Sequence, residues 1–157
     1  MKKDRLSYSA LSQFSKSPNH LLSYWNKEQK PATEAQEFGK LLHKMILEPE
    51  EMLQEYIQYE GRRAGKAWTD FQELHLSKTI VTSKLYNHCY KTYNKALNNK
   101  IFKDLLHKTT TTEKHVEWTC KGVNFHGYVD MIGEGFIADI KTTTDAGAKF
   151  ERDLYYD

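Results

Sequence analysis

The first two thirds of the chain carry apolar residues at helical spacing. Apolar positions recur every three or four residues, as in helices that bury one face. The clearest stripe begins after Thr33, a capping residue type, and ends before Pro49. The pattern predicts a helix opened by Ser7 or Ser9, a second from Pro18, a third over 33–48, a short helix and a weak extended segment over 49–59, and helices over 69–77, 83–98 and 101–106.

The last third changes to strand-like alternation. Lys121-Gly122 predicts a two-residue hairpin turn, which pairs Cys120 with Val123, Trp118 with Phe125 and Val116 with Gly127. A short turn near 133–136 joins a third strand, and the threonine run at 109–112 is expected to be a β-prone linker. Residues 146–156 are expected to be helical or irregular. The pattern therefore predicts an α/β (α+β) domain with a small mixed sheet of late strands flanked by helices.

Alternation sorts these strands into an apolar face and a polar face. The apolar face comprises Val116, Trp118, Cys120, Val123, Phe125 and Val129, and the polar face comprises His115, Glu117, His126, Tyr128 and Asp130. A two- or four-residue turn places Asp130 on the same face as Asp139 and Lys141, whereas a three-residue loop without a bulge would not. A carboxylate in an apolar strand needs a partner or a cation. These residues therefore suggest a divalent-metal site beside a lysine, as in metal-dependent phosphodiesterases.

Composition narrows the function classes. At 157 residues with a net charge of +2, the chain is expected to be one domain whose nucleic-acid binding depends on a local patch. The best candidate patch is Arg62, Arg63 and Lys66, with a solvated loop as the alternative. Cys89 and Cys120 have no metal-site spacing, which predicts a reduced protein without disulfides or an iron–sulfur cluster. No apolar run reaches membrane-spanning length.

Several motifs occur in an order that resembles a known nuclease superfamily. Asp130 followed by Asp139-Ile140-Lys141 resembles the PD-(D/E)xK motif. The segments Tyr8–Phe14 with Ser17-Pro18, and Phe38–His43, resemble the opening and the Gly-x-x-x-His helix of its RecB-like branch. The phage-type group around the RecE exonuclease (exonuclease VIII) is the closest resemblance, because Gly65–Trp68 and Asp139–Asp145 find counterparts there in the same order.

The resemblance implies a restriction-endonuclease-like core and a set of site residues. Asp130 and Asp139 would bind one or two Mg²⁺ or Mn²⁺ ions together with the Ile140 main-chain carbonyl. His43 would be a further ligand or act near the leaving group, and Lys141 would orient the attacking water or stabilise the transition state. The alternatives are a surface salt bridge among Asp130, Asp139 and Lys141, and a merely packed or exposed His43.

Three residues of the polar face have weaker assignments. Glu117 and His126 are expected to lie opposite each other, either orienting a metal ligand or forming a structural cross-strand pair. Tyr128 would stack on DNA or simply cover the sheet.

The resemblance also implies an activity and its context. The expected function is a metal-dependent DNA exonuclease acting at duplex ends, 5′→3′, in phage-type recombination. It implies a single-strand annealing protein as partner, a ring-like oligomer and a cytoplasmic location in a bacterium or phage-infected cell. The alternatives are an inactive DNA-binding fragment of the nuclease fold and a RecB-like endonuclease of a defence system.

Two departures from the branch matter. Ser17 stands where iron–sulfur members have a cysteine, in agreement with the low cysteine count. The sequence ends at Asp157 before any Gln-x-x-x-Tyr helix. The expectation is a single nuclease domain over 1–157, truncated before that helix.

Overall fold

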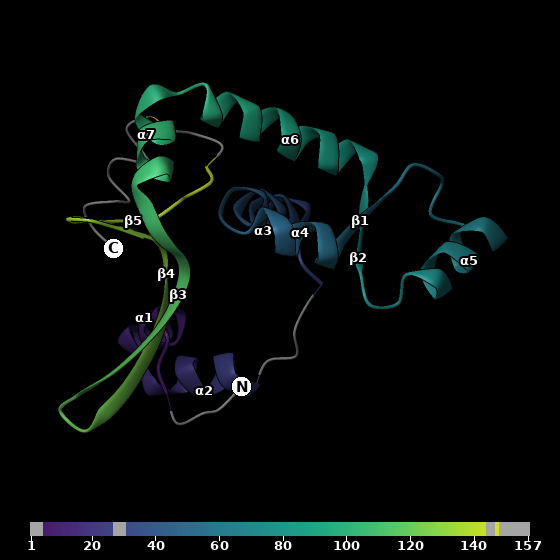
Figure 1. Cartoon of the computed structure of the whole chain (residues 1–157). Helices are drawn as coiled ribbons and strands as arrows, with labels where there is room; N and C mark the ends of the chain where they lie inside the picture. The colour runs from purple at the N-terminus through teal and green to yellow at the C-terminus, as the bar shows by residue number, and fades with distance from the viewer. Residues whose placement is uncertain (1–4, 27–30, 144–146, 148–157) are drawn as a thin grey trace.

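The computed structural model describes residues 5–26, 31–143 and 147 of the chain (Figure 1). Helices come first and the longest strands come late, which confirms the predicted fold class. The elements in chain order are α1 (Tyr8–Lys16), α2 (Pro18–Asn26), α3 (Glu34–Leu47), α4 (Pro49–Glu55), β1 (Tyr56–Tyr59), α5 (Lys66–Leu74), β2 (Thr79–Thr82), α6 (Ser83–Leu97), α7 (Lys100–Lys108), β3 (Thr109–Cys120), β4 (Val123–Gly133) and β5 (Phe136–Ala138). The segment 146–156, expected to be helical or irregular, lies outside the described residues except for Gly147.

Local capping fixes where the main helices begin. The hydroxyl of Ser7 accepts a hydrogen bond from the Ala10 amide at the start of α1. Thr33 and Gln36 form a reciprocal capping box at α3, which satisfies two backbone donors that the helix leaves free. Helix α5 begins at Lys66, three residues before the predicted start, because Gly65 at its N-cap adopts a left-handed φ of 80°.

The long hairpin has the predicted register. Cys120 pairs with Val123 and Trp118 with Phe125, and the two turn residues have positive φ, as a two-residue hairpin turn requires. The threonine run is the first part of β3 rather than a linker. The apolar face is only partly covered, because the outer half of the hairpin projects away from the α3–α7 body (Figure 1): Trp118 remains 51% exposed.

A second hairpin joins β4 to β5 through Glu134-Gly135. The register pairs Met131 with Ala138 and Gly133 with Phe136, which is the two-residue turn that the Asp130 prediction required. The three late strands form one antiparallel sheet in the order β3-β4-β5.

A separate two-stranded parallel sheet was not predicted. Strands β1 and β2 pair in register over four residues each, and α5 lies in the connection between them. The Tyr59 ring packs against Trp68 and Phe71 of α5 at 5.0 and 4.7 Å between ring centroids. Strands of four residues are too short for periodicity to distinguish them from loops.

The core lies between α3, α6 and the inner end of the late sheet. Its buried members are Leu41, Leu42, Met45, Ile46, Leu47, Met52, Val81, Leu85, Cys89 and Met131, and Ala138 and Ile140 pack against them. Met131, Ala138 and Ile140 therefore lie on the core side. Burial raises the pKa of the Cys89 thiol to about 11, in keeping with a packing role.

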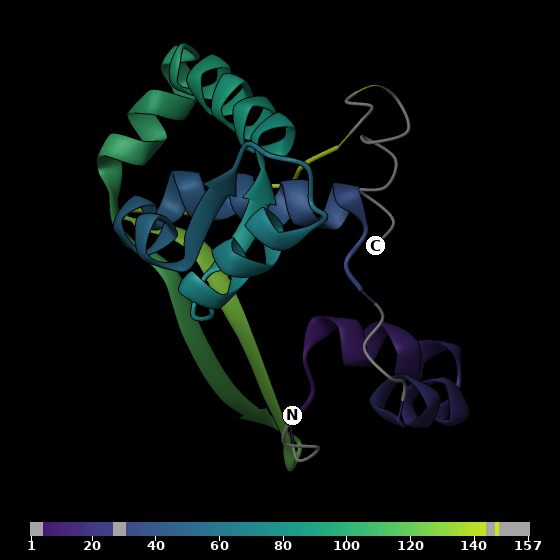
Figure 2. The same cartoon turned by 90° about the vertical axis from the view of Figure 1, so that its right-hand side faces the viewer.

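Helices α1 and α2 form a small unit of their own. Ala10 and Leu21 are buried where the two helices pack together. The unit lies apart from the α3–α7 body, beside the hairpin (Figure 2). Leu6 joins it to β4 by two backbone hydrogen bonds, one to the Asn124 carbonyl at 2.9 Å and one from the His126 amide at 3.1 Å. Among the described residues, no helix has both the length and the apolar character needed to cross a bilayer.

Candidate metal centre

His43 faces the late sheet from α3. The apolar stripe of α3 is buried in the core, which fixes the rotation of the helix about its axis. His43 then meets a carboxylate at each ring nitrogen: Nε2 lies 2.9 Å from Oδ2 of Asp130, and Nδ1 lies 2.8 Å from Oε1 of Glu113. Asp130 is 87 residues away in the sequence, so tertiary packing alone creates this contact.

Asp130 is the one buried charged residue among those the structure describes, at 7% exposure. It alternates with Met131 along β4, so the two side chains point to opposite sides of the strand. The backbone N–H of Ile140 donates a hydrogen bond to the same Oδ2 at 2.7 Å. Asp130 is therefore held from two directions, by α3 and by the chain that leaves β5.

Glu113 completes the cluster and was not among the predicted site residues. Thr112 pairs with Met131 and Lys114 with Val129, so Glu113 stands opposite Asp130 in the register. Extending the predicted hairpin pairing by a few residues leads to Glu113, but the threonine run before it favours a linker in the sequence pattern. Burial raises the pKa of the Glu113 carboxyl, and repulsion from Asp130 raises it further.

The donor set fits a divalent cation. The ligand atoms of His43, Glu113 and Asp130 all lie within 4.8 Å of one another. Two half-buried or buried carboxylates this close repel each other, and a cation offsets that repulsion. Carboxylate oxygens suit Mg²⁺ and Mn²⁺, and the imidazole favours Mn²⁺.

Asp139 and Lys141 lie at the edge of this cluster. They follow β5 on either side of Ile140, whose amide donates to Asp130. Their exposed side chains pair with each other at 2.8 Å, and Asp139 lies outside the three-residue group. The structure thus has an exposed salt bridge between Asp139 and Lys141, while Asp130 is bound elsewhere.

The remaining polar-face residues lie farther out on the hairpin. Glu117 is opposite His126, as predicted, but its carboxylate accepts a hydrogen bond from Arg5. The centroid of the His115 ring lies 5.9 Å from that of His126 and 4.9 Å from that of Tyr128. Glu117 is four residues along β3 from Glu113, or roughly 13 Å at about 3.3 Å per residue. It therefore does not contact the metal-ligand candidates.

The three basic residues Arg62, Arg63 and Lys66 differ in their contacts. The Arg63 guanidinium donates to the Ile80 carbonyl at 2.7 Å and lies 5.5 Å from the Trp68 ring centroid. Arg63 therefore ties the loop to β2 and α5. Arg62 and Lys66 are exposed, and they remain the phosphate-contact candidates of this loop.

Lys44, next to His43, is directed away from the cluster. Its ammonium group contacts Glu48 and Glu51 at 2.7 Å and Glu55 at 3.2 Å. Burial alone would lower the pKa of Lys44, but these hydrogen bonds outweigh it and raise the pKa. Lys44 is thus a fully charged anchor for α4, and His43 is the residue of this turn that faces the candidate ligands.

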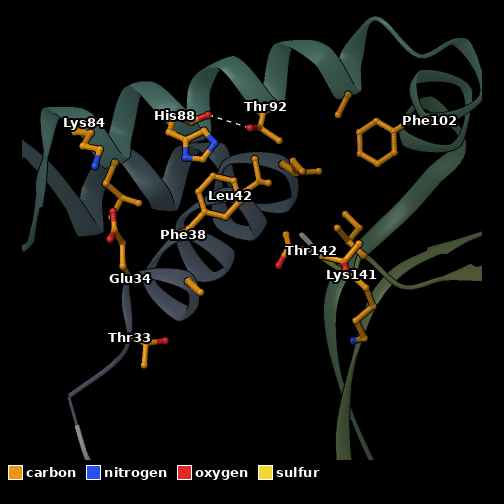
Figure 3. A pocket seen from close by; sticks show the side chains of 16 residues that line it. Thr33, Glu34, Phe38, Leu42, Lys84, His88, Thr92, Phe102, Lys141 and Thr142 are labelled. Carbon is orange, nitrogen blue, oxygen red and sulfur yellow. Dashed lines mark hydrogen bonds between the residues drawn. The ribbon is translucent and has the colours of Figure 1, made fainter. Parts of the chain in front are cut away.

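A cavity of about 1030 Å³ adjoins the cluster, between α3, α6, α7 and residues 140–143 (Figure 3). The Phe38 and His88 rings face each other at 4.6 Å across α3 and α6. Lys84 lies toward one end, and Phe102 and Lys141 lie toward the other (Figure 3). Ile140 lines the cavity, while its amide donates to Asp130, so the cavity and the cluster share the segment that follows β5.

Comparison with known proteins identifies a family for the chain. No curated protein matches the chain. The model of one family, described as a PDDEXK-like domain of unknown function (DUF3799), matches residues 7–156. That description supports the PD-(D/E)xK superfamily, whose nucleases usually use divalent metals. Because the match spans nearly all of its length, the chain belongs to the PDDEXK-like family DUF3799.

Proposed function

We propose that this protein is a Mg²⁺- or Mn²⁺-dependent deoxyribonuclease that hydrolyses phosphodiester bonds. The observation that carries the proposal is the meeting of His43 from α3 with the buried Asp130 of β4, at 2.9 Å. The buried Asp130, with the Glu113 carboxylate close by, is consistent with a cation ligand, since a buried carboxylate needs a positive partner. Family membership adds the nuclease-type fold.

Asp130 and His43 would hold the cation, and Asp139 with the Ile140 main-chain carbonyl would complete the set. Asp139 would have to leave Lys141 to do so. That exchange is easy, because an exposed ion pair of this kind contributes only about 0–1 kcal/mol. When bound, the cation would supply a more acidic water and charge neutralisation at the scissile phosphate.

Lys141 would act on the substrate. Once Asp139 turns to the cation, the ammonium group is free to hold a phosphate oxygen or to orient the attacking water. Its long, exposed side chain suits a point charge that follows the substrate. Arg62, Lys66 and Tyr128 would add backbone or stacking contacts to the duplex, with no sequence reading.

The finer proposal is an exonuclease that acts at double-stranded ends. Polarity of 5′→3′, a single-strand annealing partner, a ring-like oligomer and a cytoplasmic role in phage-type recombination rest on the ordered resemblance to the RecE group alone. They are testable separately from the hydrolysis itself.

Plasmid digestion tests the proposal. With Mg²⁺ or Mn²⁺, linear duplex should be degraded and closed circular duplex spared, and duplexes labelled at the 5′ or 3′ end should release the 5′ label first. Asp130→Asn should abolish this activity, whereas Asp104→Asn, in an exposed ion pair with Lys108, should retain it. Cutting of both plasmid forms would mean an endonuclease, and binding without cutting would mean a DNA-binding module.

A further inference from the structure

Glu113 contacts the opposite side of the His43 ring from Asp130. Its Oε1 lies 2.8 Å from Nδ1, whereas Asp130 lies 2.9 Å from Nε2. The two ring nitrogens point in different directions, so one cation cannot bind both. A cation shared by Asp130 and Nε2 would leave Nδ1 with Glu113.

The backbone of Glu113 is held in an uncommon conformation. Its φ is +47°, and among the described non-glycine residues only Lys121, in the hairpin turn, also has a positive φ. A left-handed residue inside a strand costs of order 1–3 kcal/mol and persists only when its surroundings impose it. The positive φ of Glu113 occurs where its carboxylate is directed at His43 of α3.

We propose that Glu113 is a positioning residue whose carboxylate accepts a hydrogen bond from Nδ1–H of His43. When a cation is bound, this contact would fix the ring tautomer, and Nε2 would then present its lone pair rather than an N–H on the Asp130 side. Histidines that bind metals usually donate their other N–H to a carboxylate or carbonyl, and loss of that partner lowers metal affinity about 10–100-fold. The inference rests on the proposed metal centre and adds a residue to it.

The opposite arrangement is less consistent with the contacts. If Glu113 bound the cation together with Nδ1, the buried Asp130 would be left as the orienting group at Nε2. Asp130, however, already accepts the Ile140 amide and lies beside the exit of β5, where Asp139 and Lys141 follow. The Asp130 side of the ring is therefore the side on which the remaining candidate ligands gather.

Calorimetric titration with Mn²⁺ and ¹⁵N NMR of His43 in the Mg²⁺-saturated protein test this inference. The native protein should bind Mn²⁺ and carry its His43 proton on Nδ1. Glu113→Ala should lose about 10–100-fold in Mn²⁺ affinity and give a mixture of tautomers. Glu113→Gln should lose less, because its amide oxygen still accepts from Nδ1–H, and the exposed Glu73→Gln on α5 should lose nothing.

Each other outcome is decisive. An Nε2–H tautomer in the native protein, or unchanged affinity in a folded Glu113→Ala protein, would overturn the positioning role alone. Loss of affinity with an unchanged tautomer would make Glu113 a direct ligand. Absence of Mn²⁺ binding by the native protein would overturn the metal centre and this inference together. If the alanine variant does not fold, the His43 tautomer of the native protein still decides the positioning role, and an affinity loss of about 10–100-fold in Glu113→Gln would contradict it, because the amide oxygen still accepts from Nδ1–H.

Discussion

Asp130 and Asp139 should both be needed for cleavage but should differ sharply in their effect on stability. The perturbation is substitution of each by alanine, one at a time, in the metal-free protein. Asp130 is 7% exposed and accepts two hydrogen bonds, whereas the side chain of Asp139 is 53% exposed and contacts Lys141. The proposed function treats the two carboxylates alike, so only their surroundings separate them.

The magnitudes follow from these contacts. Asp130→Ala loses the hydrogen bonds from Ile140 N–H and His43, and each hydrogen bond to a charged group contributes about 1.5–3 kcal/mol. Relief of repulsion with Glu113 returns part of this, of order 1 kcal/mol. The expected net loss for Asp130→Ala is therefore about 2–5 kcal/mol, and that for Asp139→Ala is about 0–1 kcal/mol.

Urea unfolding followed by circular dichroism, with a chelator present, measures both losses. The matched control is Asp104→Ala, which also removes an exposed carboxylate paired with a lysine. It should shift stability as little as Asp139→Ala does, yet leave cleavage intact. Equal destabilisation by Asp130→Ala and Asp139→Ala would refute the reasoning, because it would mean that burial and hydrogen bonding do not distinguish the two carboxylates.

Three further predictions concern other residues. Lys141→Ala should keep most of the Mn²⁺ affinity while slowing cleavage, and an affinity loss equal to that of Asp139→Ala would contradict separate roles. The double variant Arg62→Ala/Lys66→Ala should reduce the slope of log binding constant against log salt concentration for duplex DNA by about two. An unchanged slope would mean that this loop is merely solvated. Arg63→Ala should instead lower the melting temperature of the protein. Cys89, whose pKa burial raises from 9.0 to about 11, should resist a thiol reagent that labels exposed Cys120 in the native state. Its contribution to stability should be lost as the pH rises from 9.0 toward about 11, since only the unfolded thiol ionises readily there; Cys89→Ala should flatten this part of the pH profile.

Local patterns predicted most of the secondary structure. The stripe after Thr33 and the turn at Lys121-Gly122 each depend on neighbouring residues only, and the structure confirms both α3 and the β3–β4 register. Parallel pairing of β1 with β2 escaped prediction because each strand is four residues long and their partnership depends on the α5 connection. The sequence pattern in the hairpin also could not reveal that its outer half extends beyond the α3–α7 body, leaving Trp118 half exposed.

The site was predictable in part. Alternation and the turn length placed Asp130, and the family motif order indicated His43, although no local pattern joins residues 87 positions apart. Glu117 was expected near the ligands because alternation identifies a face but not a distance along the strand. Glu113, on the same face and opposite Asp130, occupies the place near α3 that Glu117 does not reach.

The two halves of the proposed centre differ in how firmly the fold holds them. His43 and Asp130 stand on α3 and β4, and the neighbours Leu42 and Met131 are buried in the core. Asp139 and Lys141 follow the last described strand, are exposed, and form an ion pair with each other. Fixed ligands give a cation its position at little entropic cost, while loosely held ones can change partner when a phosphate arrives. In a site built this way, His43 and Asp130 would hold the cation in place. Asp139 would add a further ligand by exchanging Lys141 for the cation, and the Lys141 ammonium group would then be available to contact the substrate.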